Sequence, residues 1–150
     1  MKRKNLLIVF FVILAVAAVV LIKEKSNRVC FKNYCFDVEL AKTTAEMSRG
    51  LMFRENLAAD KGMFFIFKKE GKYPFWMKNT LIPLDIIWIN ENKEVVFVSE
   101  NTQPCPEESP CFYINPDKNA EYVLEINGGL AGKIGLKIGD KANLSGFLAE

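Results

Sequence analysis

The sequence contains no histidine, and this absence removes several classes of function. Histidine is the usual general base that activates serine and cysteine nucleophiles, and it is a frequent ligand of zinc. A Ser-His or Cys-His mechanism and a histidine-containing metal site are therefore excluded. No glycine-rich phosphate loop is present either, because the pair Gly128 and Gly129 is too short a signal. The sequence suggests no cofactor and leans against an enzyme.

Basic residues are scarce outside the N-terminal segment. The whole chain of 150 residues has a net charge of +2. Residues 1–28 carry six of the 20 basic residues and one of the 18 acidic residues, so the remainder holds 14 basic and 17 acidic residues. A domain with a net charge of −3 has no basic field that would attract phosphates, and nucleic acid is not an expected partner.

Residues 6–22 are an uninterrupted apolar run of 17 residues, bracketed by lysine and arginine. This length is close to the minimum for a membrane span. We therefore expect a cytoplasmic n-region at 1–5, a transmembrane signal anchor at 6–22, a linker at 23–28 and an extracytoplasmic β domain at 29–150. The alternative is a cleaved signal peptide, which would leave a secreted or periplasmic domain, but no clear cleavage motif follows residue 22.

Four cysteines form two local pairs, Cys30 with Cys35 and Cys105 with Cys111. If Lys32 and Asn33 form a two-residue turn, with Asn33 able to adopt a positive φ, Cys30 and Cys35 become facing residues of a hairpin. The second pair closes a proline-rich loop. Zinc sites favour two intervening residues, whereas these pairs have four and five, so we predict two disulfides and an oxidising compartment.

Short strand patterns dominate the rest of the chain. The expected strands are residues 28–31, 34–41, 62–67, 84–89, 95–100, 122–126 and 141–144. Thr43 and Glu46 form a capping box that opens one short helix toward Leu51, and Asn127 is expected to cap a second that ends near Gly135. The fold class is therefore mostly β, a compact sandwich or barrel with two short helices behind one transmembrane helix.

Several strings occur in one order along this domain: MSRGLMFR at 47–54, KGMFFIF at 61–67, FWMKNT at 75–80, IPLDI at 82–86 and YVLEING at 122–128. Together they resemble the family catalogued as domain of unknown function 192, over residues 36–144. Cys105 and Cys111 resemble the loop cysteines of part of that family, whereas Cys30 and Cys35 do not belong to its pattern. The resemblance implies a compact, mostly β domain, often behind a signal sequence or anchor, and implies no established activity, substrate or cofactor.

Two carboxylates occupy strands with apolar neighbours. Asp85 begins the expected strand 84–89, whose two faces are both apolar, and Glu125 lies on one face of 122–126. A buried carboxylate requires a partner or a position at a pocket mouth. The expected partners of Asp85 are Lys78, Asn79 and Thr80, with Arg49 and Arg54 as further candidates.

These residues suggest a ligand-binding recess lined by Trp76, Lys78, Asn79, Thr80 and Asp85, with Arg49 and Arg54 nearby. An aromatic platform beside amide, hydroxyl, ammonium and carboxylate groups would suit a polar ligand such as a glycan fragment. The structural alternative carries similar weight: the acids would tie loops to the barrel, and Trp76 would belong to the core.

Two functional hypotheses follow. The first is a binding or cell-envelope accessory module, held to the cell membrane through residues 6–22 with its C-terminal domain outside the cytoplasm. The second is a hydrolase that uses Asp85 and Glu125 as an acid/base pair, for instance on a glycosidic bond. The second hypothesis requires the two carboxyl groups to lie about 5 to 9.5 Å apart across an open cleft. The oligomeric state cannot be read from the sequence.

Overall fold

The computed structural model of the chain describes residues 26–105 and 110–147. The n-region expected at 1–5 and the membrane span expected at 6–22 lie outside these residues, as does the first half of the linker at 23–28. Within the part of the chain that is described, no helix has both the length and the apolar composition needed to cross a membrane.

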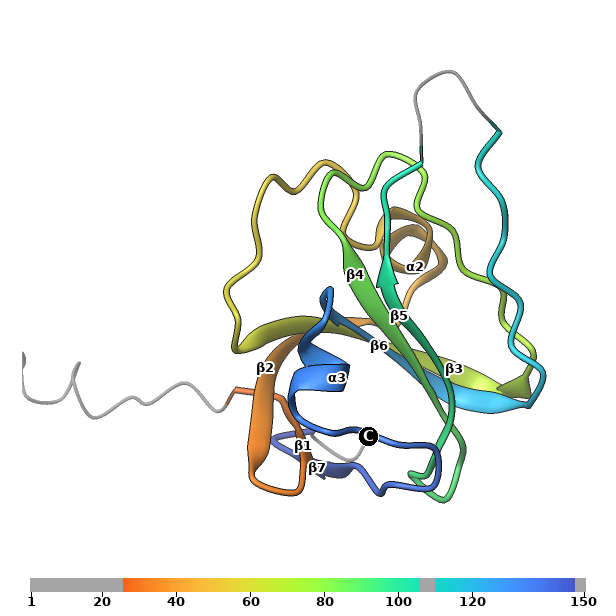
Figure 1. Cartoon of the computed structure of the whole chain (residues 1–150). Coiled ribbons are helices and arrows are strands. Elements are labelled where there is room, and N and C mark those ends of the chain that lie inside the picture. Colours follow the sequence, from red (N-terminus) through yellow and green to blue (C-terminus); the bar gives the residue numbers. More distant parts are fainter. Residues whose placement is uncertain (1–25, 106–109, 148–150) are drawn as a thin grey trace, which may run out of the picture.

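Seven strands form a single sheet in the order β5-β4-β6-β3-β2-β1-β7 (Figure 1). Only β2 and β3 are parallel, because the segment between them contains helix α2 (Thr44–Arg49) and returns the chain to the same end of the sheet. All other neighbours are antiparallel. The strands are β1 (Arg28–Phe31), β2 (Tyr34–Ala41), β3 (Lys61–Gly71), β4 (Leu84–Ile89), β5 (Val95–Thr102), β6 (Ala120–Asn127) and β7 (Asn143–Ser145).

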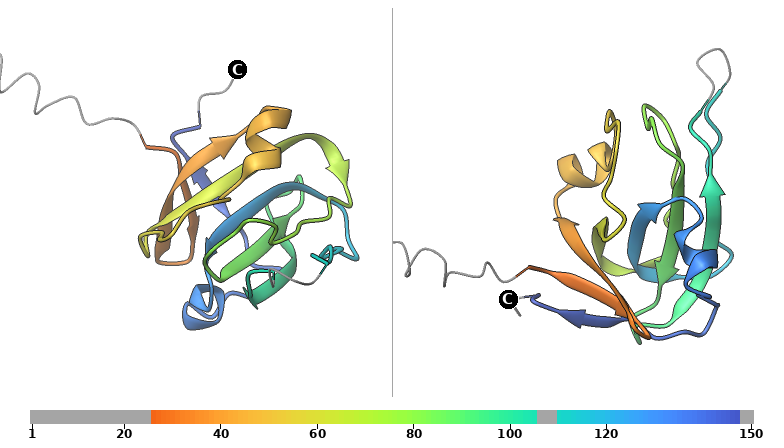
Figure 2. Two further views of the ribbon diagram at one scale, coloured as in Figure 1. Left: turned by 90° about the horizontal axis from the view of Figure 1, so that it is seen from above. Right: turned by 60° about the vertical axis from the view of Figure 1, so that its left-hand side comes forward.

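The sheet curls until its two edges approach each other, and Figure 2 shows this curvature from two further directions. Where β5 begins, the Val95 N–H donates to the Asp140 carbonyl at 2.9 Å. The Ala142 N–H donates to the Lys93 carbonyl at 2.8 Å, just before β7. The result is a mostly β half-barrel with two short helices, as the strand pattern predicts in outline. One curved sheet, rather than two stacked sheets, rules out the sandwich alternative.

Each face of the sheet carries its own core. The concave face holds one buried cluster that includes Phe64, Ile87 and Leu124. The other face holds a second cluster around Phe65 and Trp88, which is covered by α2 and the long loops. Because successive side chains of a strand point to opposite faces, the central strands must be apolar at nearly every position. All six residues of β4 are buried, which confirms the prediction of a strand buried on both faces.

Helix α2 is confirmed together with its capping box. The Glu46 N–H donates to the Thr43 hydroxyl at 3.2 Å, and the Thr43 N–H donates to the Glu46 carboxylate at 2.8 Å. The second helix, α3 (Leu130–Lys133), is preceded by Gly129 at φ +81° without a side-chain cap. The predicted Asn127 cap is wrong, because the Asn127 amide donates instead to the Leu57 carbonyl at 2.8 Å.

Both predicted cysteine pairs are disulfide-bonded. Cys30 faces Cys35 across β1 and β2 with their Cα atoms 4.0 Å apart, as the hairpin register predicts. In the turn, however, the residue with positive φ is Lys32, at +52°, rather than Asn33. The second disulfide joins Cys105 to Cys111 beside the core cluster on the α2 side of the sheet.

Candidate functional site

Asp85 is completely buried at the start of β4 and is fully occupied by backbone donors. Its carboxylate accepts hydrogen bonds from the N–H groups of Asn101 at 2.6 Å, Gly129 at 2.8 Å and Ala131 at 2.6 Å. These donors belong to the end of β5 and to the turn that opens α3. Three charge-assisted hydrogen bonds compensate the burial of the carboxylate, so Asp85 ties two loops to the sheet.

This arrangement differs from the expected partners of Asp85. The bonds to Asp85 come from backbone groups, and none comes from the side chains that were expected to pair with it: Lys78, Asn79, Thr80, Arg49 and Arg54. Backbone amides supply the donors because the chain segments at residues 101 and 129–131 converge on the end of β4. A sequence pattern cannot display such long-range backbone donors. Asp85 therefore has a structural role, in which it ties two loops to the sheet, rather than a ligand-binding one.

Asp85 and Glu125 do not share a cleft. In the pairing of β4 with β6, Glu125 is opposite Ile86 and Asp85 is opposite Ile126, an offset of one residue. Side chains one residue out of phase point to opposite faces of a sheet. Asp85 accordingly reaches Ala131 on the concave side, and Glu125 lies near Phe65 on the other side. The hydrolase hypothesis lacks its carboxylate pair.

Glu125 is the carboxyl group whose surroundings leave it incomplete. Its side chain is 5% exposed, and its Oε2 atom is buried without a hydrogen-bond partner. Burial raises the pKa of Glu125 from its ordinary value to about 8, and the Arg54 guanidinium opposes part of that rise. Buried polar atoms in folded proteins nearly always have partners, so an orphaned carboxylate oxygen indicates a place for a water or a ligand.

A small cavity of about 30 Å³ lies against Glu125, and we refer to it as the Glu125 cavity. Its volume suits one water-sized group. The cavity is enclosed by α2 and the residues that follow it, by the loop between β3 and β4, and by the floor formed from β3 and β6. Its lining residues are Met47, Ser48, Arg49, Gly50, Leu51, Met52, Phe65, Phe75, Trp76, Thr80 and Glu125.

The close approach of the chain to Glu125 depends on glycine. Gly50 ends α2 with φ +48° and ψ −136°, a combination that residues with a side chain rarely adopt. A Cβ atom at Gly50 would lie 3.4 Å from the Phe65 ring and 3.7 Å from the Glu125 Oε2 atom. On the floor, a Cβ at Gly62 would lie 2.6 Å from the Glu125 carbonyl oxygen. Glycine at these positions lets α2 and β3 pack tightly around the carboxyl group.

Two wider depressions flank the Glu125 cavity. The first, the aromatic groove, has a volume of about 320 Å³ and is lined by Thr44, Met47, Ser48, Phe65, Phe67, Tyr73, Pro74, Phe75, Trp76 and Tyr113. The second, the arginine groove, has a volume of about 450 Å³ and is lined by Glu39, Leu40, Glu46, Arg49, Gly50, Met52, Phe53, Arg54 and Met63. Each groove shares lining residues with the Glu125 cavity, so both grooves adjoin it, and we refer to the cavity and the two grooves together as the recess along α2.

Two arginines line this recess, Arg49 in both the Glu125 cavity and the arginine groove and Arg54 in the groove, and Arg54 is held by an ion pair. Its guanidinium binds the Glu39 carboxylate through two hydrogen bonds, each 2.6 Å long. This pairing raises the pKa of Arg54 and lowers the pKa of Glu39. The positive charge of Arg54 also favours the ionised form of Glu125, which partly offsets the rise in its pKa that burial causes. The recess is therefore flanked by a fixed cation and floored by a carboxyl group.

Aromatic rings form the opposite end of the recess. The rings of Trp76 and Tyr113 stack with an interplanar angle of 7° and centroids 5.2 Å apart. The ammonium group of Lys78 lies 5.1 Å from the centroid of the Trp76 ring, within the range of a cation–π contact. Tyr113 is 55% exposed, so part of this stack is available to a ligand.

Asn79 and Thr80 connect the two loops that enclose the Glu125 cavity. The Asn79 carbonyl accepts a hydrogen bond from the Phe53 N–H at 2.8 Å, and both residues have positive φ. The Asn79 side-chain amide approaches the Met52 sulfur at 3.9 Å. Thr80 is buried and lines the cavity. Asn79 thus holds the cavity walls together, and Thr80 forms part of the wall.

Six of the seven predicted site residues gather on the α2 side of the sheet, and Asp85 does not. Trp76, Thr80 and Arg49 line the Glu125 cavity, Arg54 lines the arginine groove, and Lys78 contacts Trp76. The sequence did not place Gly50 or Tyr113 at this site. Tyr113 follows the proline-rich loop and has no pattern that would assign it to Trp76. The backbone conformation of Gly50 is imposed by tertiary contacts, so the sequence alone does not predict it.

A metal centre receives no support from the described residues. Among residues 26–105 and 110–147, no group of three or more cysteine, aspartate or glutamate side chains is close enough together to hold a metal ion. The four cysteines are all engaged in disulfides. The recess therefore offers hydrogen bonds, charge and aromatic surface.

The fold is a mostly β half-barrel, and on its α2 side a buried carboxyl group lies beside a groove. The chain belongs to the family domain of unknown function 192, whose description is "Uncharacterized ACR" and whose sequence model matches residues 27–144. The match spans nearly all of the described half-barrel. It confirms the family predicted from the strings around Trp76 and Asp85.

Two solved structures are similar to this chain. A protein of unknown function from Novosphingobium aromaticivorans is 38% identical, with a TM-score of 0.71 over 79% of this chain and 83% of that one. A protein from Sinorhizobium meliloti, described as a "putative transcription regulator", is 31% identical, with a TM-score of 0.72 over 81% of this chain and 93% of that one. No curated protein matches the sequence at a significant level.

Proposed function

We propose that the protein is a single-pass membrane-anchored binding module whose domain lies outside the cytoplasm and binds a polar ligand in the recess along α2. The observation that carries this proposal is the Glu125 Oε2 atom, which is buried without a partner beside a cavity. A ligand group that donates a hydrogen bond would satisfy this oxygen. The proposed role is a cell-envelope accessory protein that recognises its ligand without transforming it.

The dimensions of the recess restrict the ligand. A cavity of about 30 Å³ accepts one small donor, such as a hydroxyl or an N–H group. The body of the ligand would occupy the wider aromatic and arginine grooves, whose volumes are typical of small-molecule sites. A glycan fragment supplies hydroxyl donors for Glu125 and apolar ring faces for the exposed part of the Trp76 and Tyr113 stack.

The proposed location has separate support. Two disulfides in one small domain favour an oxidising compartment, which lies outside the cytoplasm. The apolar run at residues 6–22 would hold the domain at the membrane surface, with residues 23–28 as a short linker. A net charge of −3 on residues 29–150 argues against nucleic acid as the ligand.

The ligand hypothesis is tested with the full-length protein purified in detergent. Fragments of cell-envelope glycans are screened by the shift in melting temperature, and hits are confirmed by calorimetric titration. We expect Glu125→Gln to weaken binding above pH 8, where the native carboxyl group is ionised, because the amide has one acceptor oxygen where the carboxylate has two. Glu94→Gln is the matched control, since the Glu94 side chain is partly exposed, does not line the recess and pairs with Lys141 at 3.6 Å. A ligand that binds Glu125→Gln as tightly as the native protein would contradict the proposed site.

The location is tested by protease treatment of intact cells. Protease added from outside is expected to cleave within residues 29–150, and both cysteine pairs should resist thiol reagents unless a reductant is present. A domain that is protected until the cells are lysed, and whose cysteines react as free thiols, would place it in the cytoplasm and refute this part of the proposal.

A further inference from the structure

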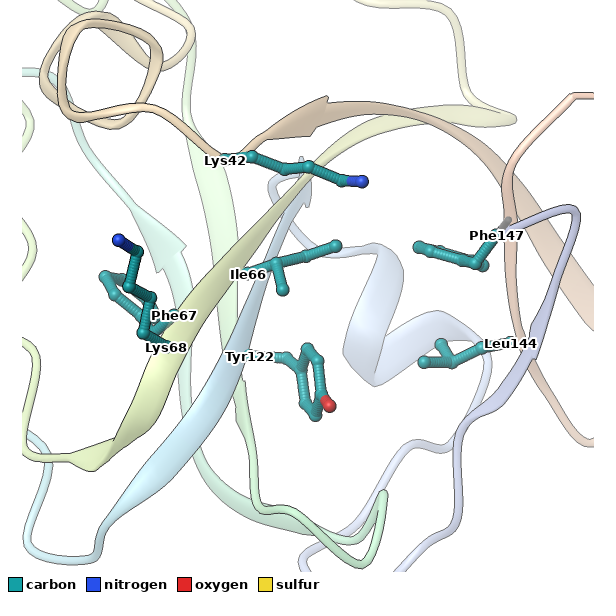
Figure 3. A pocket seen from close by; sticks show the side chains of 7 residues that line it. All are labelled: Lys42, Ile66, Phe67, Lys68, Tyr122, Leu144 and Phe147. Atoms are coloured by element: carbon teal, nitrogen blue, oxygen red, sulfur yellow. The ribbon is translucent and has the colours of Figure 1, made fainter. Parts of the chain in front are cut away.

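The concave face of the half-barrel opens at a second pocket, on the side of the sheet opposite the Glu125 cavity. This pocket has a volume of about 440 Å³ and is shown in Figure 3. We refer to it as the barrel-mouth pocket. Its lining residues are Lys42, Ile66, Phe67, Lys68, Tyr122, Leu144 and Phe147.

The walls of the barrel-mouth pocket are apolar. Ile66 and Tyr122 face Leu144 and Phe147 across the open space in Figure 3. All four side chains are only partly buried and pack on the core cluster of the concave face. Below them, the Phe64 ring stacks on Tyr122 and meets the Phe147 ring edge-on, with centroid separations of 5.4 and 5.3 Å. The hydrophobic core therefore extends outward into a cleft that is still open.

The only ionisable charges among the lining residues are positive. Lys42 and Lys68 belong to the lining, and no carboxylate does. In Figure 3 the Lys42 side chain lies over Ile66 with its ammonium group directed toward Phe147. An apolar cleft with ammonium groups at its rim is complementary to an anionic amphiphile, whose chain avoids water and whose head group attracts cations.

The pocket also lies close to the point where the chain enters the domain. Strand β7 pairs with β1, and Leu144 is directly opposite Val29. Gly146 packs so closely on Ser26 that a Cβ atom at Gly146 would lie 2.2 Å from the Ser26 carbonyl oxygen. One wall of the pocket is therefore built next to residues 26–29. If residues 6–22 span the membrane, a linker of a few residues holds this wall near the membrane surface.

We propose that the barrel-mouth pocket takes up one acyl chain of an anionic lipid from the membrane in which the protein is anchored. The chain lies between Ile66, Leu144 and Phe147, and the phosphate of the head group contacts Lys42. Lys68, which Figure 3 shows directed to the other side of β3 beside Phe67, adds positive charge at a greater distance. This inference rests on the membrane anchoring that is part of the proposed function, and it is independent of the ligand in the α2 recess. The acyl chain of such a lipid contacts the apolar walls, and its anionic head group is attracted by the lysines.

The inference is tested by photo-crosslinking with the full-length protein reconstituted into vesicles of phosphatidylcholine and phosphatidylglycerol. The probe is a phosphatidylglycerol with a diazirine at the end of one acyl chain, and a phosphatidylcholine with the same chain is the comparison. Crosslinked peptides are identified by mass spectrometry. We expect the anionic probe to label residues 61–68 and 141–147, in addition to the membrane segment at 6–22.

Two kinds of variant sharpen the result. Leu144→Trp or Ile66→Trp should fill the cleft and remove the label from the domain, while near-ultraviolet circular dichroism shows that the fold is retained. Lys68→Gln should reduce pocket labelling by the anionic probe roughly fivefold, the effect of removing one lysine from an anionic surface. Lys118→Gln is the matched control, since Lys118 is exposed and does not line the pocket.

The outcomes separate this inference from the proposed function. Label that is confined to residues 6–22 would overturn the lipid pocket and leave the membrane anchor intact. No label anywhere, with the protein recovered free of vesicles, would refute the anchor and the lipid pocket together. Equal labelling of the pocket by both probes would overturn the assignment of the lysines to an anionic head group.

Discussion

Asp85 and Glu125 are buried carboxyl groups on neighbouring strands, yet their environments are opposite. Asp85 accepts three hydrogen bonds from backbone N–H groups, whereas Glu125 retains an oxygen without any partner. They are almost equally inaccessible, at 0% and 5% exposure. Burial alone therefore does not distinguish a structural carboxylate from a candidate for ligand binding. The distinction lies in whether the hydrogen-bonding capacity is filled by the protein itself.

The position of each group in the sheet explains the difference. Asp85 is near the N-terminal end of β4, where chain segments leave the sheet and their N–H groups are free to bond. Glu125 is within β6, where neighbouring N–H groups are already used by β3 and β4. Phe65, Leu51 and Met47 beside Glu125 have no N–H or O–H donor. Four lining residues do carry donors, but none of them bonds to the Oε2 atom: Ser48, Arg49, Trp76 and Thr80. A water or a ligand group in the cavity can therefore supply the partner.

The largest effect is expected for Asp85→Ala. The substitution leaves three N–H groups at the end of β4 without their acceptor, and each buried unsatisfied donor costs about 1–3 kcal/mol. We expect a loss of about 5 kcal/mol of unfolding free energy, or failure to fold, measured by urea denaturation. Asp85→Asn should be milder, because its carbonyl oxygen can still accept from two of the donors. A change below 1 kcal/mol for Asp85→Ala would show that Asp85 does not hold these loops.

The second-largest effect is expected for Glu125→Gln, which should stabilise the protein rather than destabilise it. The folded-state pKa of Glu125, about 8, is higher than its ordinary value of 4.5, so the folded protein binds an extra proton between these pH values. Stability is therefore lost as the pH rises from 4.5 to 8. Glu125→Gln removes this loss. At about 1.4 kcal/mol per pKa unit the upper limit is about 5 kcal/mol, and we expect about 3 kcal/mol of stabilisation at pH 8.

The pH dependence is the informative part of the Glu125→Gln experiment. The stability difference between the variant and the native protein should be small at pH 4.5 and should grow up to pH 8, as measured by denaturation at each pH. A bound water or an added ligand that satisfies Oε2 would reduce the difference. If the difference did not vary over this range, Glu125 would titrate at an ordinary pKa, and the comparison with Asp85 would lose its basis.

A smaller effect is expected for Gly50→Ala, which acts on the wall of the Glu125 cavity. The backbone of Gly50 is in a region that is almost restricted to glycine, and such strain costs about 1–3 kcal/mol. We expect a loss of about 2 kcal/mol and weaker ligand binding, because the new methyl group is directed toward Phe65 and Glu125. Gly135→Ala is the matched control. Gly135 also has a positive φ, at +64°, but faces open space, so ligand binding should not change.

Much of the fold is predictable because it depends on local patterns. The apolar run in β4, the capping box at Thr43 and the hairpin of Cys30 and Cys35 are all local features, and the structure contains each of them. The closure of the half-barrel and the parallel pair of β2 and β3 depend on contacts between distant segments. The Asn127 cap failed because that side chain bonds across the fold to Leu57.

The site is less predictable than the fold, and the reason is physical. Residues close in sequence, such as Trp76 to Thr80, share a loop and therefore remain together on one side of the sheet. Asp85 is separated from them by the Pro83 corner, and the alternation of β4 directs it to the other face. The same alternation places Glu125 on the α2 side. The two carboxyl groups point to opposite faces because of the pairing register of β4 with β6, which is not visible in the sequence.

The smallest expected effect tests the electrostatics that separate the two carboxyl groups. Arg54→Gln removes the cation that attracts negative charge on Glu125, so the pKa of Glu125 should rise further above its present position near 8. The shift is measured by carbon-13 NMR titration of the glutamate side chains, with Glu125→Gln used for assignment. Stability should change by less than 1 kcal/mol, because the Arg54 and Glu39 side chains are partly exposed.

Glu39→Gln is the control for this last experiment, because it breaks the same ion pair and leaves the guanidinium in place. Without Glu39, the full charge of Arg54 acts on Glu125, so the pKa of Glu125 should fall rather than rise. Opposite shifts in the two variants would establish that Glu125 responds to the Arg54 charge. Identical shifts would mean that both variants act by loosening the loop around Arg54, and the low polarity of the cavity alone would then account for the difference between Glu125 and Asp85.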